Sequence, residues 1–583
     1  MQRVFVQIVA FVTCAVQFLC NFVGLVPAGK SSLQTDLDTL FSPIKMASTV
    51  YILDPRSYTE DEQAMLAFLQ GIAAQDEASI FFEEYESHRQ VLERFRQAHP
   101  EIGFVTSVVD PWELVDLFKD KFDGRFVTFG AAEKGDPTII MASNLASTQG
   151  YLGVPASLRE QALAHGLTQV RDLREIKGSF AEKQQVILNE CYDQFRTRRI
   201  LMHINANDFW GRDVGIAQGA LFFFTREAVS DFAHCFEERA LRDSVFAWAD
   251  PAARLLGFWE DGDETLFINA VSVAGKSVSP VHELQNSSFL LAMGDCGPLV
   301  QPGTPEPSPS NDKHTICFYV TDGDNLGAVI KKGGVCAQYP HMMGPRSASG
   351  DDFPIAYTNN PLIGYLQPAA AAYFYDNDDP LGLGAHDSYI AGLSGLGACH
   401  TFQLPKKNLR DHAKMSAQAM EKTDMHVFTT EEEYLFNPFW WLYPKRVIDE
   451  FAKYDTIHGA FIQLNPHHYS GGLGCVVWSS NGKPWIGVRT VLWSPDGDRD
   501  SVTQEWLDGF VDSINRRSAN TSCIGGYSVI AIHPWSITYA SLQYIVSKLD
   551  PSRVQIVSPD TLVQMVTENV PHKNALPPLV KAY

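Results

Sequence analysis

Two aspartates, Asp322 and Asp324, stand two positions apart directly after the apolar run Thr315–Val320. If the strand geometry of that run continues, both side chains point to the same side and can act as a pair. Hydrolysis of a glycosidic bond needs two carboxyl groups, one kept protonated by burial or by a like charge and the other ionised as nucleophile or base. We therefore predict Asp322 and Asp324 as catalytic carboxyls; the alternative is an ordinary polar turn that caps a helix.

A third candidate carboxyl, Glu431, begins the acidic cluster Glu431–Glu433, which follows the apolar run Met425–Thr429. Glu431 would complete a pair across the scissile bond with either aspartate. The alternative is a solvated first turn of a helix, where acidic side chains interact favourably with the helix dipole.

Other polar and aromatic residues follow further apolar runs in the same way. Histidine can hydrogen-bond a sugar hydroxyl or exchange a proton near neutral pH, and the flat faces of indole rings stack on sugar rings. For each of these residues the alternative is ordinary packing or a polar turn. The predicted substrate-binding residues of this kind are Asn325, Trp493, His533 and Trp535.

The same residues would also allow a metal site made of Asp322, Asp324 and His533, since carboxylates and imidazoles suit zinc or manganese. No HxxxH-type pair supports such a site in the sequence, so neither a metal nor another cofactor is predicted. GxSxG, P-loop and Rossmann motifs do not occur in a suitable strand-to-helix context. Acyl-transfer, nucleotide and dehydrogenase chemistry are therefore disfavoured.

The elements that would position these residues are eight apolar, strand-like runs, separated by helical or loop segments, in about 260 residues. This size and repeat predict an α/β fold with a (β/α)8 TIM-like barrel over residues 313–572, in which the strand ends meet at one mouth. An open, doubly wound sheet is the alternative. The runs are Thr315–Val320, Leu362–Leu366, Ser388–Leu393, Met425–Thr429, Gly459–Leu464, Trp485–Leu492, Tyr527–Ile532 and Val554–Val557.

Residues 48–300 are expected to form an N-terminal α/β region, as one unit or as two subdomains. From Thr49 to Gly150, strand-like runs alternate with helical patterns, and Thr138–Met141 counts among the strand-like runs. This rhythm predicts a mostly parallel sheet. Four prolines within Gln301–Ser310 mark residues 301–312 as a linker to the barrel.

The chain as a whole has 583 residues, enough for two or three domains. Its 46 Lys+Arg and 68 Asp+Glu give a formal charge of -22, which would repel nucleic acid and anionic membranes. The uncharged stretch Val4–Gly29 predicts that residues 1–28 are the signal peptide of a secreted, extracellular protein; the alternative is an uncleaved N-terminal membrane anchor. Glycosylation sequons at Asn286 and Asn520 fit export.

A wider pattern is carried by the segments Leu53–Arg56, Leu69–Ile72, Arg212–Ala217, Leu256–Asp261, Gln285–Ser288, Asp322–Asn325, Ala391–Gly397 and Val529–Ser536. In this order they resemble the GxGYxYP family of "putative glycoside hydrolases". The resemblance implies a dedicated N-terminal region followed by a barrel-like C-terminal domain. It also adds Glu260 and Asp261, which could reach over the barrel mouth as substrate-binding residues; the alternative is an exposed acidic turn.

The chain departs from the family in the signature motif itself. Gly395-Leu396-Gly397 is present, but Ala398-Cys399-His400 follows where Tyr-x-Tyr-Pro is expected, and the next proline is Pro405. This departure allows an altered substrate preference or a loss of activity.

These observations together predict a glycoside hydrolase that acts on an unidentified glycan through carboxyl acid/base chemistry at the barrel mouth. Two alternatives stay open: a carbohydrate-binding protein without catalysis, and a metal-dependent carbohydrate esterase. The expected partner is a carbohydrate substrate and not nucleic acid, and contact with a membrane is expected only through an uncleaved N-terminal anchor.

Overall fold

The computed structural model describes residues 36–577, apart from positions 109, 134, 227–234, 258–263, 282–283, 296, 298, 303–308, 328–350, 377–382, 434–444, 466–471 and 498–500. The predicted signal peptide, the middle of the predicted linker, and the predicted site residues Glu260 and Asp261 lie outside the described residues. Among the described helices, none combines the length and the apolar character needed to cross a membrane.

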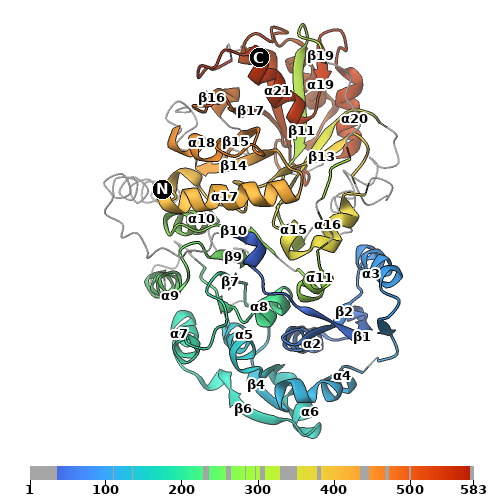
Figure 1. Ribbon diagram of the computed structural model, residues 1–583, viewed down its shortest axis with the longest axis vertical. Coiled ribbons are helices and arrows are strands. Elements are labelled where there is room, and N and C mark those ends of the chain that lie inside the picture. The colour runs from blue at the N-terminus through green and yellow to red at the C-terminus, as the bar shows by residue number, and fades with distance from the viewer. Residues whose placement is uncertain are drawn as a thin grey trace.

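Seven parallel strands close into a barrel in the C-terminal half of the chain, at the top of Figure 1. Each strand pairs with the next around the ring, and the last strand returns to pair with the first. The prediction of an α/β fold with a closed C-terminal barrel is thereby confirmed. In ring order the strands are β11 (His314–Val320), β12 (Ile355–Asn359), β13 (Asp387–Ala391), β14 (Val427–Glu433), β15 (Gly459–Asn465), β17 (Pro484–Leu492) and β18 (Tyr527–Ile532).

The expected eighth strand does not complete the ring. β19 (Val554–Ile556) pairs with the first half of β11, from His314 to Ile316, whereas β12 pairs with Tyr319 and Val320 in the second half. Because β18 occupies the other edge of β11 along its length, β19 and β12 must share one edge. β19 has only 3 residues, too few to separate β11 from β12. The predicted eightfold arrangement is therefore corrected to seven closing strands.

One of the predicted strands is a helix. The run Leu362–Leu366 forms the short helix α15 (Ile363–Leu366), and the second strand of the barrel lies earlier, at β12. Asn360 starts the turn, since its Oδ1 accepts a hydrogen bond from the backbone N–H of Leu362. Pro361 then suits a helix start, where a missing N–H costs nothing.

The barrel has an apolar interior that is closed at the end where its strands begin. Helix α21 (Pro559–Asn569) contributes Val563 and Met565 to the interior cluster, and Val563 packs against Gly459, the first residue of β15. α21 therefore covers this end of the barrel. The residues that the barrel strands contribute to the cluster are Cys317, Tyr319, Ala356, Ile390, Val427, Phe461, Ile486, Val488, Tyr527, Val529 and Ala531.

Further helices surround the barrel and bury the outward side chains of its strands. Helix α17 (Lys406–Lys422) runs beneath the barrel in Figure 1, between the barrel and the N-terminal half. In chain order these helices are α16 (Pro368–Phe374), α17 (Lys406–Lys422), α18 (Lys445–Phe451), α19 (Gln504–Asn515) and α20 (Tyr539–Lys548).

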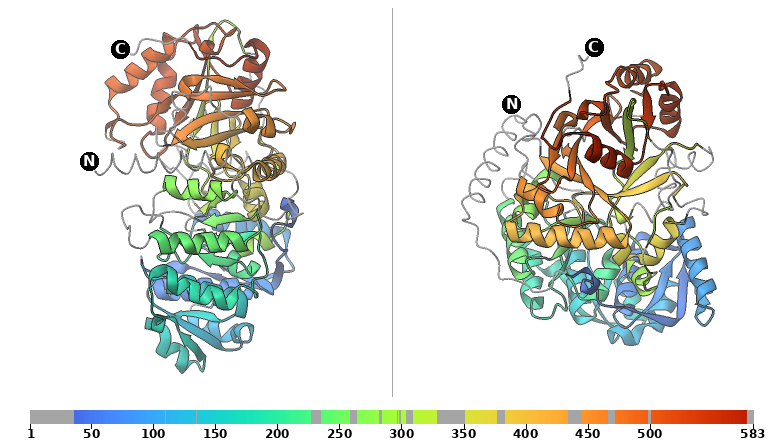
Figure 2. Two further views of the ribbon diagram at one scale, coloured as in Figure 1. Left: turned by 90° about the vertical axis from the view of Figure 1, so that its left-hand side faces the viewer. Right: turned by 45° about the horizontal axis from the view of Figure 1, so that its top comes forward.

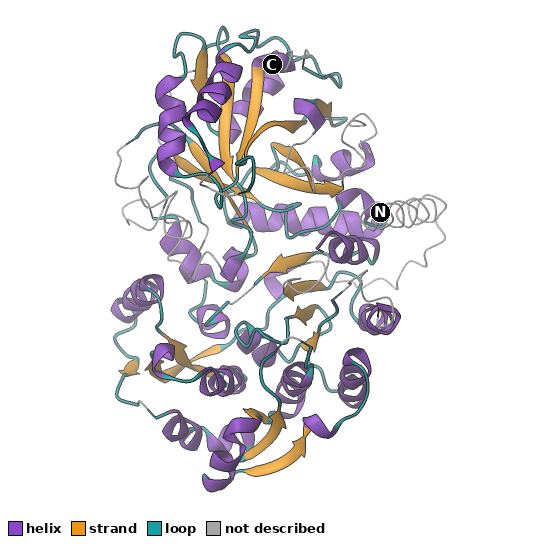
Figure 3. Ribbon diagram, turned by 180° about the vertical axis from the view of Figure 1, so that it is seen from behind, coloured by secondary structure: helices purple, strands orange, loops and turns teal. Residues whose placement is uncertain are grey.

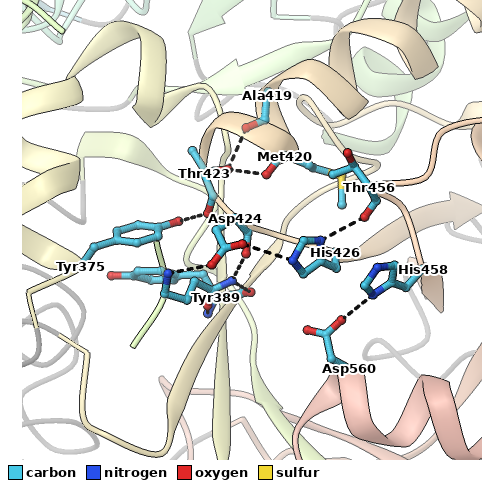
Figure 4. Close-up of polar contacts among 11 residues, drawn as sticks. Tyr375, Tyr389, Ala419, Met420, Thr423, Asp424, His426, Thr456, His458 and Asp560 are labelled. Atoms are coloured by element: carbon cyan, nitrogen blue, oxygen red, sulfur yellow. Dashed lines mark hydrogen bonds and ion pairs between the residues drawn. The ribbon is translucent and has the colours of Figure 1, made fainter. Parts of the chain in front are cut away.

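The ring is weakest between β13 and β14, where the strands pair only at Ala391 and Phe428. Below this point Gln301, the first residue of the predicted linker, takes the place of a strand partner. The Gln301 amide accepts from Tyr389 N at 2.5 Å and donates to Tyr389 O at 3.2 Å. Gln301 N also donates to Asp424 Oδ2 at 2.8 Å, in the cluster that Figure 4 shows.

Two stacked histidines, His426 and His458, belong to the same cluster and lie just before the first residues of β14 and β15. Their ring centroids are 4.5 Å apart. His426 Nε2 lies 3.2 Å from Asp424 Oδ1 and His426 Nδ1 lies 3.2 Å from Thr456 O, while His458 Nδ1 lies 3.0 Å from Asp560 Oδ1 (Figure 4). Because both nitrogens of His426 face acceptors, its ring is suited to the doubly protonated form. The hydrogen bond to Asp424 accordingly raises the pKa of His426.

The N-terminal half contains three small parallel sheets, seen at the bottom of Figure 3 and toward its middle. The first has the order β2 (Glu77–Phe82), β1 (Lys45–Leu53) and β3 (Gly103–Val105). The second has the order β5 (Leu152–Pro155), β4 (Arg125–Phe129) and β6 (Thr168–Asp172). The third, which lies nearest the barrel, has the order β10 (Val278–Pro280), β9 (Arg254–Gly257), β7 (Ile200–His203) and β8 (Leu221–Phe223).

Helices pack between these sheets. The first residues of one of these helices were predicted to form a strand. The run Thr138–Met141 is the first turn of α5 (Thr138–Gln149), whose residues from Thr138 to Ser147 are all buried. A helix that is buried on every side has no polar stripe, so a short apolar run from it resembles a buried strand. The main helices of this half are α2 (Glu60–Ala73), α3 (Glu86–Ala98), α4 (Pro111–Leu117), α6 (Arg159–Ala164), α7 (Phe180–Cys191), α8 (Arg212–Gln218), α9 (Cys235–Trp248), α10 (Glu264–Val273) and α11 (Ser287–Ala292).

One of the two glycosylation sequons lies inside this core. The Asn286 side chain is fully buried and exchanges hydrogen bonds with Phe82, accepting from its N at 2.8 Å and donating to its O at 2.9 Å. Asn520, by contrast, is exposed. Only the second sequon is therefore accessible in the folded chain.

The third sheet and the barrel are in direct contact, as both views in Figure 2 show. Val278 of β10 forms an antiparallel bridge with Ala398, which follows β13, through backbone hydrogen bonds of 3.1 and 2.8 Å. Arg254 of β9 also reaches α17, where its Nη1 lies 2.9 Å from His412 Nδ1. The N-terminal half is thus packed against loops at the end of the barrel where the strands finish, which we call the mouth.

Candidate active site

The turn that follows β11 carries Asp322 and Asp324 at the mouth. Asp322 has a φ of 65°, in the left-handed region, so the strand geometry does not continue through the pair as predicted. The two carboxyls are coupled nevertheless, because the negative charge of Asp322 raises the pKa of Asp324.

Gly323 makes this turn possible by lying directly against the end of β12. A Cβ added to Gly323 would be 1.9 Å from Thr358 O, a distance that no side chain tolerates. Gly323 N donates to Thr358 Oγ1, and Thr358 Oγ1 donates to Val320 O, each at 3.0 Å. The turn is therefore fixed to two neighbouring strands, which holds the flanking aspartates in place.

Asp324 has the electrostatic character of a proton donor. Its side chain is buried, and burial together with the negative charges of Asp322 and Glu264 raises its pKa to about 7. A carboxyl with this pKa is partly protonated at neutral pH, as general acids are. A Cβ built on Gly392, just after β13, would be 3.6 Å from the Cβ of Asp324, so Asp324 lies where the ends of β11 and β13 approach each other.

Glu264, the first residue of α10, is a carboxyl near this site that the sequence analysis missed. Its negative charge contributes to the raised pKa of Asp324. α10 is attached to the barrel, since Ser272 Oγ accepts a hydrogen bond from His400 N at 2.8 Å. The signal for Glu264 was its position three residues beyond the family-like segment that ends at Asp261.

Trp493 and His533 come together on the neighbouring strands of the mouth. Ile532 pairs in register with both Val320 and Leu492, so the residues that follow β11, β17 and β18 leave the barrel at one level. The rings of Trp493 and His533 are stacked, with centroids 3.5 Å apart and planes inclined by 6°. The structure thus brings these two predicted residues to the same end of the barrel as the aspartates.

The loop after β18 holds the ring of His533 in place and leaves the ring of Trp535 exposed. His533 Nδ1 lies 2.9 Å from Ser536 Oγ, and the same Oγ accepts a hydrogen bond from Ser494 N at 3.2 Å. Trp535 is 43% exposed. An exposed indole that follows a barrel strand is a suitable surface on which a sugar ring can stack.

The remaining predicted residues have other surroundings. Glu431 lies within β14 and pairs in register with Gln463, so the prediction that it follows the strand is wrong: β14 continues to Glu433. The side chain of Glu431 is outside the described part of the structure. Asn325 Oδ1 accepts a hydrogen bond from Gly327 N at 3.1 Å, which is the polar-turn role considered for this segment.

The three-residue metal site considered above is not formed. Within the described residues, which include Asp322, Asp324 and His533, no three His, Cys, Asp or Glu side chains are arranged so that they could hold a metal ion. The geometry therefore gives no support to the metal-dependent esterase alternative.

The altered signature motif lies in the contact between the two halves of the chain. Ala398, Cys399 and His400 are all fully buried. Ala398 bridges to β10, and Cys399 Sγ lies 3.6 Å from His412 Nε2. Thr401, at the position of the signature proline, donates from its backbone N to the buried Glu432 Oε1 at 3.2 Å, a bond that proline cannot make.

Comparison with a solved structure agrees with this fold. A crystal structure described as a putative hydrolase from Bacteroides thetaiotaomicron VPI-5482 superposes with a TM-score of 0.76 at 21% sequence identity, covering 93% of this chain and 99% of that one. At this identity the similarity concerns the fold alone. No curated protein is similar enough in sequence to match.

Three family models match the sequence. Residues 312–567 match the "GxGYxYP putative glycoside hydrolase C-terminal domain". Residues 49–120 match the first domain of the N-terminal part of this family, and residues 201–292 match its third domain. The three matches follow the family's order along most of the chain, and the chain therefore belongs to the GxGYxYP family.

Proposed function

We propose that this protein hydrolyses glycosidic bonds, with Asp324 as the general acid. The observation that carries the proposal is the state of Asp324: a buried carboxyl at the end of a barrel strand, beside Asp322, with a pKa raised to about 7. Glycosidases need one carboxyl that keeps its proton near neutral pH next to others that are ionised. The family description as "putative glycoside hydrolase" supports the same reaction class.

In this mechanism Asp324 transfers its proton to the glycosidic oxygen while the bond from that oxygen to the sugar carbon breaks. The negative charge of Asp322 favours the protonated form of Asp324 before the reaction and stabilises the positive charge that develops on the sugar. Glu264 and Glu431 are the candidates for the second catalytic carboxyl. That carboxyl either attacks the sugar carbon and is then displaced by water, or takes a proton from the water that attacks the carbon directly, so that the sugar leaves with a hydroxyl at that carbon. The exposed ring of Trp535 and the stacked pair Trp493 and His533 would contact the sugar.

The decisive experiment measures hydrolysis of a panel of alkyl glycosides, whose alkoxide leaving groups depend on a proton donor, by the parent, Asp322→Asn and Asp324→Asn. Loss of a general acid lowers the rate by about 10²- to 10⁴-fold, so we expect both variants to lose activity while keeping the parent's circular dichroism spectrum. Asp560→Asn is the matched control, because Asp560 lies at the opposite end of the barrel. Unchanged turnover in both site variants would remove the assignment.

A second candidate function is glycan binding without hydrolysis. Ala398 and His400 stand where the signature has its two tyrosines, and both are buried, so nothing supplied by tyrosine hydroxyls at these positions is present. Saturation-transfer NMR with the glycans of the panel would detect binding. Binding without turnover would favour this candidate.

We also propose that the chain is exported by residues 1–28, as its uncharged N-terminal stretch predicts. Expression of the full chain followed by N-terminal sequencing of the mature protein tests this. A product that still begins at Met1 and remains inside the cell would contradict it.

A further inference from the structure

A hydrogen bond between Tyr319 and Gln463 spans the interior of the barrel just below the mouth. Tyr319 Oη donates to Gln463 Oε1 at 3.0 Å, and both side chains are buried. Tyr319 lies on β11 and Gln463 on β15, which are separated by three strands on one side of the ring and by two on the other. The bond therefore joins opposite walls of the barrel.

This bond marks the upper boundary of the apolar interior. Tyr319 belongs to the interior cluster, and so does Phe461, which stands two residues before Gln463 on β15. The site lies above the bond. Burial raises the pKa of Tyr319 well above its usual value, and the charges of Cys317 and Asp322 raise it further, so Tyr319 is close enough to Asp322 to feel its charge. Tyr319 and Gln463 are thus the floor beneath the carboxyl pair.

The side-chain nitrogen of Gln463, Nε2, takes no part in the hydrogen bond to Tyr319. This nitrogen is buried and meets no hydrogen-bond acceptor within the part of the chain that the structure describes. Thr429 Oγ1, on the neighbouring strand β14, is also buried without a partner among the described residues. A buried donor without an acceptor is unfavourable, and native proteins contain few of them. A ligand at the mouth would remove this cost.

We propose that Gln463 positions the bound sugar, with its Nε2 donating a hydrogen bond to a sugar hydroxyl oxygen while Tyr319 holds its Oε1. The inference rests on the proposed function and deepens it by naming a substrate-binding residue inside the barrel. A neutral amide suits a neutral hydroxyl, and its fixed partner on the opposite wall leaves it little freedom to turn. The contact would discriminate between sugars that differ in one hydroxyl group.

Kinetics on an alkyl glycoside that the parent cleaves provide the first test. For Gln463→Ala we expect KM to rise about tenfold, the loss of one hydrogen bond to substrate, with a smaller change in kcat. Tyr319→Phe should raise KM less, because Nε2 is still present. Gln555→Ala is the matched control: Gln555 lies on β19 and bonds Ser310 and Thr315 at the opposite end of the barrel. An unchanged KM in Gln463→Ala would overturn the proposal.

Monodeoxy versions of the same glycoside separate substrate contact from a structural role. The parent should lose affinity for one of them, and Gln463→Ala should no longer distinguish that analogue from the complete sugar. Equal discrimination by the parent and by Gln463→Ala would contradict the proposal, whether or not the substitution lowers the stability of the protein.

A failure of the proposal for Gln463 can be distinguished from a failure of the proposed hydrolysis. If the parent cleaves no glycoside of the panel, hydrolysis is refuted, and Gln463 is then tested by saturation-transfer NMR with glucose, galactose, mannose and N-acetylglucosamine. A signal in the parent that is lost in Gln463→Ala supports the proposal. Equal signals in the two proteins, or none in the parent, overturn it.

Discussion

At the level of single residues, burial and then the negative charge of Asp322 raise the pKa of Asp324. A general acid works only while it holds its proton, so turnover should fall as the pH rises through about 7, the pKa of Asp324. Asp322→Asn removes a negative charge that raises this pKa. In that variant the pH profile of the residual kcat/KM should therefore lose its alkaline limb at lower pH than in the parent. An alkaline limb at the same pH in both proteins would contradict the coupling.

The same carboxyl is expected to reduce stability at alkaline pH. Its usual pKa is 3.8 and its folded pKa is about 7, so the native state binds the proton more tightly than the unfolded chain. Stability from this group is then greatest below pH 3.8 and falls as the pH rises through the folded pKa. Asp324→Asn should raise Tm relative to the parent at pH 8 and change it little at pH 4. Equal Tm differences at both values would count against a buried, protonated carboxyl.

Residues next to a strand end could be predicted from the sequence, whereas residues brought in by tertiary contacts could not. Asp322, Asp324, Trp493 and His533 each directly follow an apolar run or lie within a few residues of it, and the structure places them at one end of the barrel. Glu264 was missed because it reaches the site on a helix of the N-terminal half. Its closeness to Glu260 and Asp261 in the sequence was the one available indication.

At the level of elements, the strands were predictable where apolar character extended over a whole buried strand. β18 was predicted with its observed bounds and β11 to within one residue. Prediction failed for short apolar runs in buried helices, as with α5 and α15, because a run of four or five residues is too short to show a period. It also failed for β12, whose Thr358 and Asn359 make its end polar.

The lower end of β14 should show a pH dependence of stability that comes from His426. The hydrogen bond to Asp424 raises the pKa of His426 above its usual 6.5, and Asp560 adds to this. Its stabilising contribution is therefore complete below pH 6.5 and is lost as the pH rises through the folded pKa. The contribution is small, about 1 kcal/mol or less, because the pair is partly exposed.

Urea unfolding of the parent and of Asp424→Asn at pH 6 and pH 9 measures this contribution. The variant should be less stable than the parent at pH 6, and the difference should shrink at pH 9, where His426 is neutral in both proteins. A difference that does not change with pH would show that Asp424 acts through Gln301 N, its other hydrogen-bond partner, and not through the histidine.

At the level of the whole molecule, the closure of the barrel and its contact with the third sheet depend on pairings between distant segments. The number of closing strands is decided by how β12 and β19 divide one edge of β11. Strand-like runs can be counted in a sequence, but their partners and registers cannot. For the same reason the altered signature motif gave no indication that it lies against β10.

Arg254 is the residue on which we expect the coupling of the two halves to depend. It is buried, and its Nη1 donates to Ser277 Oγ at 2.5 Å and lies 2.9 Å from His412 Nδ1 in the barrel helix α17. His412 Nε2 lies 2.7 Å from Ser394 O, which can only accept, so Nε2 carries the proton and Nδ1 is the acceptor for Arg254. Burial, and then the charge of Arg254, lower the pKa of His412 to about 3, which keeps this acceptor neutral.

Arg254→Met would fill much of the same space but leave His412 Nδ1 without its donor, at a cost of about 1–3 kcal/mol. Because the lost bonds join the third sheet to the barrel, we expect calorimetric unfolding to change from one transition in the parent to two in the variant. Arg56→Met is the control, since Arg56 pairs with Asp54 on the surface, away from the contact between the halves. A single transition in Arg254→Met, with the Tm of the control, would mean that the apolar contacts between the halves are sufficient without this hydrogen-bonded link.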